Sequence, residues 1–325
     1  MSRPIERWIV ARPELLAAVL DRLGPHGVTA CRDGRVFVDG TRAQTSDQQL
    51  EVGSVVEVYA PRPRVAGVTV LTERGGVVFV DKPAGVATEP DHGGASACVL
   101  SEVALLLAVP ESTLHALSRL DVGVSGLVLI GRDSEACRRV QTLRAEGKVR
   151  RRYIALVAGA IEPRAGVWHD SIAKLGRGAR RSAVGDELGT RAETRYLVID
   201  RVTRVPRSTP PPGREPRSET YSVLALEPVT GRTHQLRVHA AAHGAPMLGD
   251  RTYGGPSRIT LSNGEVRPLD RVALHSAWVE LPGGPRVASR IPQDFRALWT
   301  ALGGEPSVLD RAVAERELGA ELAPR

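Results

Sequence analysis

Apolar runs of helix and strand length alternate with turn-forming residues along most of the chain, which predicts an α+β fold. Residues 13–23 carry one apolar stripe between Pro13 and Gly24, as expected of a helix that ends at the glycine. Two short apolar runs, 35–40 and 55–59, follow and predict strands on either side of a polar loop. These elements predict a small α+β domain over residues 1–62.

A stiff polar connection follows this domain. Pro61-Arg-Pro-Arg64 is typical of a linker, because proline restricts the backbone and arginine stays hydrated. We therefore expect a linker over residues 63–74, a larger domain over 75–302 and a C-terminal tail over 303–325. A chain of 325 residues is long enough for more than one hydrophobic core.

The larger domain is predicted to mix strands and helices. Strands are expected at the start of 76–85, before a Lys-Pro-x-Gly turn, and at 127–130, 153–159, 195–200, 221–226 and 272–280. Helices are expected at 98–108, from Asp133 or Ser134 to about Gly147, after an N-cap at Thr233, and at 292–302. The Pro- and Arg-rich segment 201–218 is expected to be a long hairpin loop.

The stretch 117–131 combines charged, turn-forming and apolar residues in one short segment. Arg119 and Asp121 precede a Gly/Ser turn and the apolar run 127–130. In an extended backbone, residues i and i+2 point to the same side, so these two charged groups can face one cavity while Leu120 faces the core. A solvated surface ion pair is the alternative interpretation, since short motifs are often false positives.

The composition of the chain indicates that the protein binds an anionic partner. The net charge of +7 and the pI near 9.8 come mostly from arginine and favour nucleic acid. Three widely spaced cysteines, Cys31, Cys98 and Cys137, indicate neither a disulfide framework nor a zinc site, and they favour a reducing, cytoplasmic setting. The first residues lack the pattern of a secretory signal, and no apolar run has the length of a membrane span.

Two basic segments are candidates for contacts with phosphates. One directly precedes the strand 153–159, and the other is a Gly- and Arg-rich segment over 174–191. Such runs are more often merely solvated faces. The candidate residues are Lys148, Arg150, Arg151, Arg152, Arg180 and Arg181.

Two histidines raise the question of a metal. His239 and His243 are four residues apart, which on one helix could place both rings on the same ion. No glutamate stands between them in the position that zinc proteases use, and no third ligand is in view. We therefore expect no metal site.

Four ordered motifs resemble those of the RluA-type family of RNA pseudouridine synthases. They are Arg-Leu-Asp-x-x-x-Ser-Gly-Leu at 119–127, Tyr-x-Ala-x-Val-x-Gly at 153–159, Gly-Arg-Thr-His-Gln-Leu-Arg-Val-His at 231–239 and Leu-His-Ser-Ala at 274–277. The resemblance covers roughly residues 75–302. An ordered set of motifs is far more specific than any one of them.

The resemblance implies a mixed, mainly antiparallel sheet flanked by helices, with an RNA-binding cleft across its face. It also implies a reaction without a metal or other cofactor. By position in the motifs, Asp121 would be the catalytic aspartate, Arg237 its basic partner and Leu236 a wall of the uracil pocket. Tyr153 would be the active-site tyrosine, and Arg119 would help to displace the target base.

The chemistry of uridine isomerisation suits these residue types. An ionised carboxylate can attack or deprotonate the ribose, or attack C6 of uracil, and a neighbouring guanidinium favours its charged form. The base must first leave its stack at a cost of a few kcal/mol, and a tyrosine ring offers a stacking surface in exchange. The residues leave the choice between sugar and base attack open.

The chain departs from the family pattern at three positions. The family usually has His where Ser118 stands, Thr where Val124 stands and His where Glu89 precedes Pro90. These changes leave Asp121 and Tyr153 in place, so we expect activity with altered hydrogen bonding around the loop and altered target choice.

The N-terminal helix and strand order resembles an S4 RNA-binding domain, although the region between Gly24 and Gly34 is shorter and less basic than that family's second helix. By analogy this favours ribosomal RNA over transfer RNA as the partner. We expect a monomer with no membrane association.

Two alternative functions stay open. One is a catalytically silent RNA-binding protein that uses the same cleft. The other is a serine hydrolase built on Ser125 with a histidine such as His115, although Gly123-Val-Ser-Gly126 is not a Gly-x-Ser-x-Gly elbow.

Overall fold

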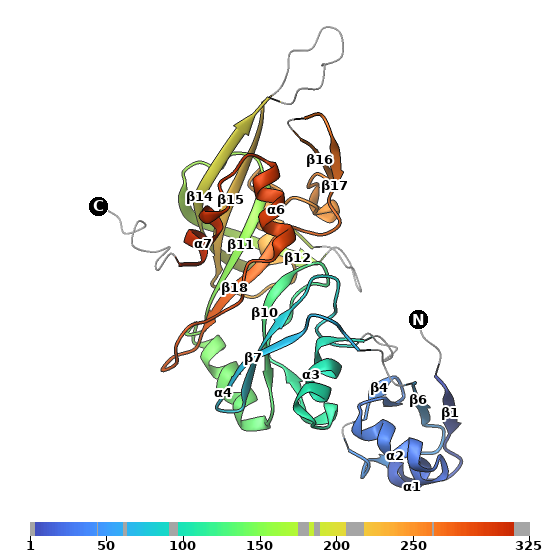
Figure 1. The fold of residues 1–325 in the computed structure, drawn as a ribbon. Helices are drawn as coiled ribbons and strands as arrows, with labels where there is room; N and C mark the ends of the chain where they lie inside the picture. Colours follow the sequence, from blue (N-terminus) through green and yellow to red (C-terminus); the bar gives the residue numbers. More distant parts are fainter. Residues whose placement is uncertain are drawn as a thin grey trace. The chain divides into compact units, whose positions relative to one another are not determined.

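The computed structural model describes residues 4–43, 45–60, 64–90, 97–174, 182–184, 189–205, 218–261 and 263–314 (Figure 1). It divides into two compact units. The first contains Met1–Val122 and Val128–Thr142, and the second contains Gly123–Leu127 and Leu143–Arg325. Each unit is described by itself below.

The first unit begins with a small helix-and-strand arrangement around its own hydrophobic cluster. Strands β1 (Glu6–Ile9), β6 (Val55–Val58), β3 (Val36–Val38) and β4 (Thr41–Arg42) form an antiparallel sheet in that order. The helices are α1 (Leu16–Arg22) and α2 (Pro25–Arg32), and the short strands β2 (Glu14–Leu15) and β5 (Gln49–Leu50) pair with each other. The predicted helix therefore starts at Leu16 rather than Pro13, because the two preceding residues are held in a β-ladder. The buried cluster includes Leu16, Val19, Leu20, Val36 and Val56.

The remaining elements of the first unit enclose a second buried cluster. Strands β7 (Thr69–Arg74) and β8 (Val77–Lys82) pair, and β9 (His115–Ala116) pairs with β10 (Ser125–Gly131). Helices α3 (Val99–Leu107) and α4 (Ser134–Ala145) flank these strands (Figure 1), and η1 (Glu111–Thr113) is a single 3₁₀ turn. The predicted helices 98–108 and 134–147 are confirmed, and Asp133 caps α4 by accepting a hydrogen bond of 2.7 Å from the Ala136 amide. The linker expected over 63–74 is wrong in its second half, because Thr69–Arg74 is a strand.

The second unit is built on an antiparallel sheet with the strand order β13-β12-β14-β15-β11-β18. The strands are β11 (Arg150–Ala158), β12 (Ala165–Lys174), β13 (Ser182–Val184), β14 (Thr190–Arg204), β15 (Glu219–Pro228), β18 (Leu274–Glu280) and the short β19 (Val287–Ala288). A separate hairpin consists of β16 (Arg258–Thr260) and β17 (Val266–Pro268). Strands β14 and β15 are longer than predicted, so the residues between them are fewer than 201–218, and 206–217 lie outside the described residues.

Helices cover parts of this sheet. Helix α5 (Gln235–Ala242) packs against β12, β13, β14 and β15, and α7 (Ser307–Ala314) packs against β11, β14 and β15. Helix α6 (Gln293–Ala301) and the 3₁₀ turn η2 (Arg251–Tyr253) complete the unit. The tail predicted over 303–325 is therefore wrong up to residue 314, because Val308, Leu309 and Ala312 of α7 are buried.

Strand β10 makes the sheet mixed. Its first residues, Ser125 and Gly126, pair in parallel with His275 and Ser276 of β18, whereas the pairings of β10 with β9, of β11 with β15 and β18, and of β14 with β15 are antiparallel. A Cβ on Gly126 would lie 2.2 Å from the Ser276 carbonyl oxygen, and the backbone φ is +107°, so only glycine fits there. The predicted α+β class with a mixed, mainly antiparallel sheet flanked by helices is confirmed.

Candidate functional site

The loop that carries Asp121 lies in the first unit and is fixed by hydrogen bonds on both sides of the aspartate. Thr88 uses its hydroxyl twice: it accepts from the Leu120 amide and donates to the Leu120 carbonyl, each at 3.2 Å. On the other side, the Gly85 amide donates to the Val122 carbonyl at 2.7 Å. Asp121 itself is half-buried, and Leu120 packs against the apolar cluster of this unit, as predicted. The backbone around the carboxylate is thus held in one conformation.

A buried lysine supports the same loop. The Lys82 side chain is fully buried, and its ammonium donates to the carbonyls of Pro83 (3.0 Å), Val86 (2.7 Å) and Val122 (3.3 Å). A buried ammonium is costly unless its donors are satisfied, and carbonyl oxygens do that here. The Lys-Pro-x-Gly turn therefore connects β8 to the residue that follows Asp121. Sequence reasoning recognised the turn but missed this role of the lysine.

Arg119 lies on the surface of the first unit. Its side chain is 73% exposed and is 3.4 Å from the Glu89 carboxylate, which makes a weak surface ion pair. Such a pair gives the guanidinium little restraint. Of the departures from the family pattern, Ser118 accepts a hydrogen bond of 2.8 Å from the Leu129 amide and Val124 is buried, so both fit their places in the loop.

Arg237 lies on α5 in the second unit and is bound by the carboxylate of Asp250, which sequence reasoning missed. Its Nε and Nη2 each donate to Asp250 at 2.7 Å, and both residues are buried. Asp250 also accepts from the Thr252 amide at 3.2 Å, and the Tyr253 ring lies 5.0 Å from the guanidinium. In the sequence, Asp250 stands in the turn-rich segment Gly249–Gly255, which predicts a turn but no partner for Arg237. The pairing of Arg237 with Asp121 that the resemblance implies stays a prediction.

Helix α5 does not begin as predicted. Its N-cap is His234, in a left-handed conformation with φ of 57°, and not Thr233. The loop before it is held by the buried Gln235 instead. The side-chain oxygen of Gln235 accepts from the Thr230 hydroxyl (2.7 Å) and the Arg232 amide (3.0 Å), and its amide nitrogen donates to the Glu193 carbonyl (2.9 Å). Leu236 follows and is 7% exposed.

Tyr153 lies on β11, which begins at Arg150 rather than at the tyrosine. The ladder with β18 shifts register between Arg152 and Tyr153, so a bulge precedes the tyrosine. Bulges redirect side chains and are common beside active sites. Tyr153 is half-buried, opposite Leu226 on β15 and Ser276 on β18.

The basic segment before Tyr153 is not uniformly available to phosphates. The prediction is wrong for Arg152, which is fully buried, donates to Glu227 at 2.6 Å and stacks 5.1 Å from the centre of the Trp278 ring. Burial lowers the pKa of Arg152, and the hydrogen bond to Glu227 opposes that shift. Lys148 and Arg150 are exposed, with Lys148 2.9 Å from Glu146. The other two candidates, Arg180 and Arg181, lie outside the described residues.

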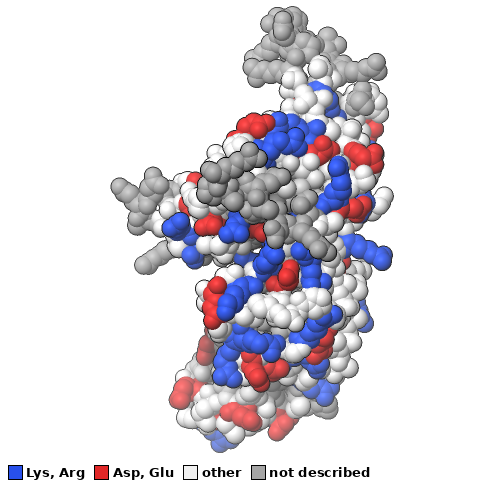
Figure 2. All heavy atoms as spheres, turned by 90° about the vertical axis from the view of Figure 1, so that its left-hand side faces the viewer, with Lys and Arg blue, Asp and Glu red and all other residues white. Residues whose placement is uncertain are grey.

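Charge on the surface is mixed rather than gathered in one patch. Figure 2 shows a face on which Lys and Arg side chains are spread over several places with Asp and Glu side chains among them. Several arginines are paired, for example Arg132 with Glu73 at 3.0 Å and Arg201 with Glu162 at 2.8 Å. Net charge alone therefore does not locate an RNA-binding surface.

The serine hydrolase alternative receives no support from Ser125. Its hydroxyl is 3.0 Å from Nδ1 of His275 rather than from the suggested His115, and both Ser125 and His275 are buried. Burial lowers the pKa of His275 to about 3. A nucleophile must be reachable by its substrate, so this pair is part of the core.

The two histidines considered as metal ligands have other contacts. His243 is hydrogen-bonded to Asp170 at 2.9 Å and stacks on Trp168, while His239 is fully buried, with Nε2 3.8 Å from Asp170. Desolvation lowers the pKa of His239 to about 4. No group of three potential ligands is positioned to hold a metal ion within the described ranges.

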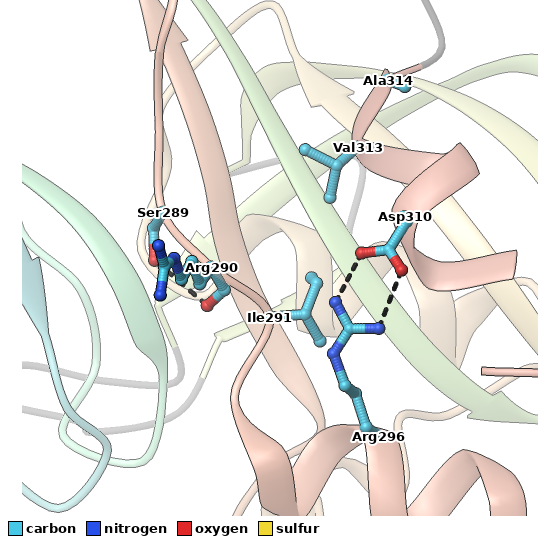
Figure 3. Close-up of a pocket in the computed structure, with 7 residues that line it drawn as sticks. All are labelled: Ser289, Arg290, Ile291, Arg296, Asp310, Val313 and Ala314. Atoms are coloured by element: carbon cyan, nitrogen blue, oxygen red, sulfur yellow. Dashed lines mark hydrogen bonds and ion pairs between the residues drawn. The ribbon is translucent and has the colours of Figure 1, made fainter. Parts of the chain in front are cut away.

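A cavity of about 460 Å³ in the second unit contains none of the predicted site residues. It is lined by Ser289, Arg290, Ile291, Arg296, Asp310, Val313 and Ala314 (Figure 3). Arg296 crosses it to pair with Asp310 of α7, with Nη1 and Oδ2 2.9 Å apart. This pair joins α6 to α7, so we assign the cavity to the packing of the two helices.

Comparison with solved structures identifies the fold. Human RNA pseudouridylate synthase domain containing 1 superposes with a TM-score of 0.55 at 22% identity, covering 77% of this chain and 96% of that chain. Human RNA pseudouridylate synthase domain containing 4 gives a TM-score of 0.54 at 21% identity, covering 72% and 92%. The described chain therefore has the fold of a pseudouridylate synthase.

Comparison of sequences then gives the family. The RNA pseudouridylate synthase family model matches residues 76–242, just over half of the chain. A relative from Pseudomonas aeruginosa, ribosomal large subunit pseudouridine synthase D, is 30% identical over 82% of this chain and 83% of its own length. The protein of the same name from Xanthomonas campestris is 29% identical, covering 83% and 82%. The chain belongs to the RNA pseudouridine synthase family, whose members are isomerases. In the parts of the chain that are described, no helix has the length and apolar character to cross a membrane.

Proposed function

We propose that this protein isomerises specific uridines of ribosomal RNA to pseudouridine, with Asp121 as the catalytic carboxylate. The names of the relatives from Pseudomonas aeruginosa and Xanthomonas campestris support ribosomal RNA as the substrate. The observation that carries the proposal is the set of hydrogen bonds that fixes Leu120 and Val122 on either side of Asp121. Such fixed placement is what a carboxylate needs to meet a bound nucleotide in one geometry.

The reaction breaks the bond between C1′ of the ribose and N1 of uracil and forms one between C1′ and C5. The C5 proton is lost and N1 gains a proton, so substrate and product contain the same atoms. The Asp121 carboxylate acts on the ribose or on C6 of uracil, and both routes require it to be ionised. We propose Arg237, oriented by Asp250, as the basic residue that favours this charged form.

Two further residues would contact the extruded base. Tyr153 offers an aromatic ring for stacking, and Leu236 offers an apolar wall for uracil. Arg119 would occupy the place of the extruded nucleotide in the RNA stack, and its weak restraint at the surface suits a side chain that must move. This assignment follows the resemblance position by position.

Phosphates would be held by basic residues that stay accessible. Lys148, Arg150 and Arg151 are the described candidates, and Arg180 and Arg181 are proposed from sequence alone. Phosphate contacts of this kind position an RNA without specifying its sequence. We further propose that the N-terminal unit of residues 1–62 is an S4-like RNA-binding domain and that the protein works as a cytoplasmic monomer.

The proposal is tested by mapping pseudouridine in ribosomal and transfer RNA from cells with and without this protein. Loss of pseudouridine at one or a few ribosomal positions, restored by the native protein and not by Asp121→Asn, is the expected result. Purified protein should form pseudouridine in unmodified ribosomal RNA, again only with Asp121 present. Product from the Asp121→Asn variant would contradict the assignment of the catalytic residue.

The silent RNA-binding alternative predicts a different result. The native protein and the Asp121→Asn variant would then bind the RNA equally and neither would form product. Binding should therefore be measured beside product formation on the same RNA.

A further inference from the structure

One turn of the chain supplies two different contacts to the guanidinium of Arg237. Asp250 accepts two hydrogen bonds along the edge that contains Nε and Nη2. Three residues further on, Tyr253 places its ring 5.0 Å from Cζ of Arg237, a distance typical of a cation held by an aromatic ring. The hydrogen bonds limit rotation of the guanidinium and the ring limits its displacement, so the two contacts restrict different movements.

The turn that carries both contacts is rigid. The Asp250 carboxylate accepts from the Thr252 amide at 3.2 Å, and the Asp250 carbonyl accepts from the amides of Tyr253 (3.2 Å) and Gly255 (2.8 Å). A Cβ on Gly255 would lie 1.9 Å from the Met247 carbonyl oxygen, so only glycine fits there. The carboxylate and the ring are therefore held at a fixed distance from each other.

Packing accounts for the ring of Tyr253 but not for its hydroxyl. The ring packs against the apolar cluster of Ile172, Ala192 and Val238, which a phenylalanine would do as well. The hydroxyl is hydrogen-bonded to Nδ1 of His234 at 2.7 Å, and the two rings meet edge to face with their centres 5.7 Å apart. This hydrogen bond fixes the far end of the tyrosine.

His234 adopts an unusual backbone conformation to make this bond. Its φ is 57°, in the left-handed region, which is unfavourable for a residue with a Cβ. It is the N-cap of α5, yet its side chain makes no capping hydrogen bond. Strained residues of this kind occur where function requires a side chain in one place. Arg237 lies three residues later, so His234 and Arg237 from one element and Tyr253 and Asp250 from the other form a closed ring of contacts.

We propose that Tyr253 and His234 are positioning residues for uridine isomerisation, which hold the guanidinium of Arg237 in the direction that the carboxylate of Asp121 requires. The inference rests on the proposed function, because it takes Arg237 as the basic partner of Asp121. In this role both residues act through Arg237 rather than on the RNA. The group that fixes the arginine then consists of Asp250, Tyr253 and His234.

Removal of the Tyr253 hydroxyl is the first test. Tyr253→Phe keeps the ring beside Arg237 but loses the hydrogen bond to His234. We expect kcat on unmodified ribosomal RNA to fall about fivefold, as the loss of one hydrogen bond predicts. KM should change by less than about twofold, because the guanidinium acts in the transition state.

Tyr221 provides a matched control in the same unit. Its hydroxyl donates to Glu219 at 2.7 Å, and its ring centre lies 5.1 Å from Cζ of Arg204, so it combines the same two kinds of contact at another place. Tyr221→Phe should retain the native kcat and KM.

A pair of substitutions at His234 is the second test. Glycine and asparagine both tolerate a left-handed backbone, and the asparagine amide extends about as far from Cβ as Nδ1 does. His234→Gly should therefore lower kcat about fivefold, whereas His234→Asn, which can still bind the hydroxyl, should retain most of it. Adding Tyr253→Phe to His234→Gly should cause no further fall, because both changes remove the same hydrogen bond.

The outcomes separate this role from the enzyme assignment. Product formation by the native protein, with unchanged kcat for Tyr253→Phe or with losses that multiply in the double variant, would overturn the positioning role alone. A raised KM with native kcat would overturn it too, because it would indicate direct contact with the RNA. A native protein that forms no pseudouridine would overturn both proposals. Urea unfolding identifies any variant that fails to fold, and if His234→Gly does, the comparison of Tyr253→Phe with Tyr221→Phe decides.

Discussion

Arg237 and Asp250 are joined by two hydrogen bonds of 2.7 Å, and both side chains are buried. This geometry fixes the plane of the guanidinium, which a single contact would not do. The carboxylate comes from the turn before η2, thirteen residues along the chain. Asp250 therefore positions an arginine that the proposed mechanism needs.

Replacing Asp250 tests this positioning. Asp250→Ala should lower the free energy of unfolding by about 3–5 kcal/mol, because it leaves a buried guanidinium without its carboxylate. Pseudouridine formation per folded protein should fall as well, in kcat more than in KM. Urea unfolding and single-turnover kinetics measure the two effects.

The double variant Arg237→Met with Asp250→Leu provides the control for Asp250. Removing both charges together should recover much of the lost stability, since an apolar pair can replace a buried ion pair. Activity should stay low. Recovery of activity in the double variant would contradict a role for Arg237.

Substitution of Lys82 should loosen the loop that carries Asp121. Lys82→Met keeps the length of the side chain but removes the donor to three carbonyls, one of which belongs to Val122. We expect a loss of about 3 kcal/mol in the free energy of unfolding and at least roughly a tenfold fall in kcat. Thr88→Val should reduce kcat through Leu120 on the other side, whereas Thr88→Ser, which keeps the hydroxyl, should not.

Substitution of Arg119 should, in contrast, reduce activity while leaving stability almost unchanged. Arg119→Ala removes a surface ion pair of 3.4 Å, so the free energy of unfolding should change by less than about 0.5 kcal/mol. Product formation should nevertheless fall by roughly a hundredfold if the side chain helps to displace the base. Glu89→Gln breaks the same ion pair and should leave activity intact, which separates the role of Arg119 from that of the pair.

Acid should destabilise the protein through two buried histidines. Burial lowers the pKa of His239 to about 4 and that of His275 to about 3, below the ordinary value of 6.5. The unfolded chain therefore binds protons that the folded chain does not, and stability falls as the pH drops below about 6.5. Each histidine contributes at most about 1.4 kcal/mol per pH unit, down to its folded pKa. Urea unfolding between about pH 7 and pH 4 should show this slope, and His239→Gln should make it shallower.

Local sequence patterns predicted most of the helices and strands, because each kind of element places its apolar residues at regular intervals along the chain. The helices α3 and α4 and the buried strand β10 agree with their apolar runs. The predicted start of α1 was wrong because Glu14 and Leu15 pair as a strand with residues more than thirty positions away. The buried face of α7 was missed because its partners lie on the sheet of the second unit.

The site shows the same difference between features that a local pattern predicts and features that depend on residues distant in sequence. The motifs were enough to select Asp121 and Arg237, but the groups that hold them come from elsewhere in the chain. Asp250 had no pattern that set it apart from other acidic residues in turns. Arg152 was misassigned because its burial depends on Glu227 and Trp278, which are far from it in sequence.

The burial of Arg152 affects how strongly RNA binding by this protein should depend on ionic strength. An arginine that is neutralised inside the fold attracts no polyanion and displaces no condensed cations from one. With Arg152 bound to Glu227 and Lys148 beside Glu146, the segment 148–152 releases fewer ions from RNA than its four positive residues suggest. Its complexes with RNA should accordingly tolerate more salt than a count of basic residues would indicate.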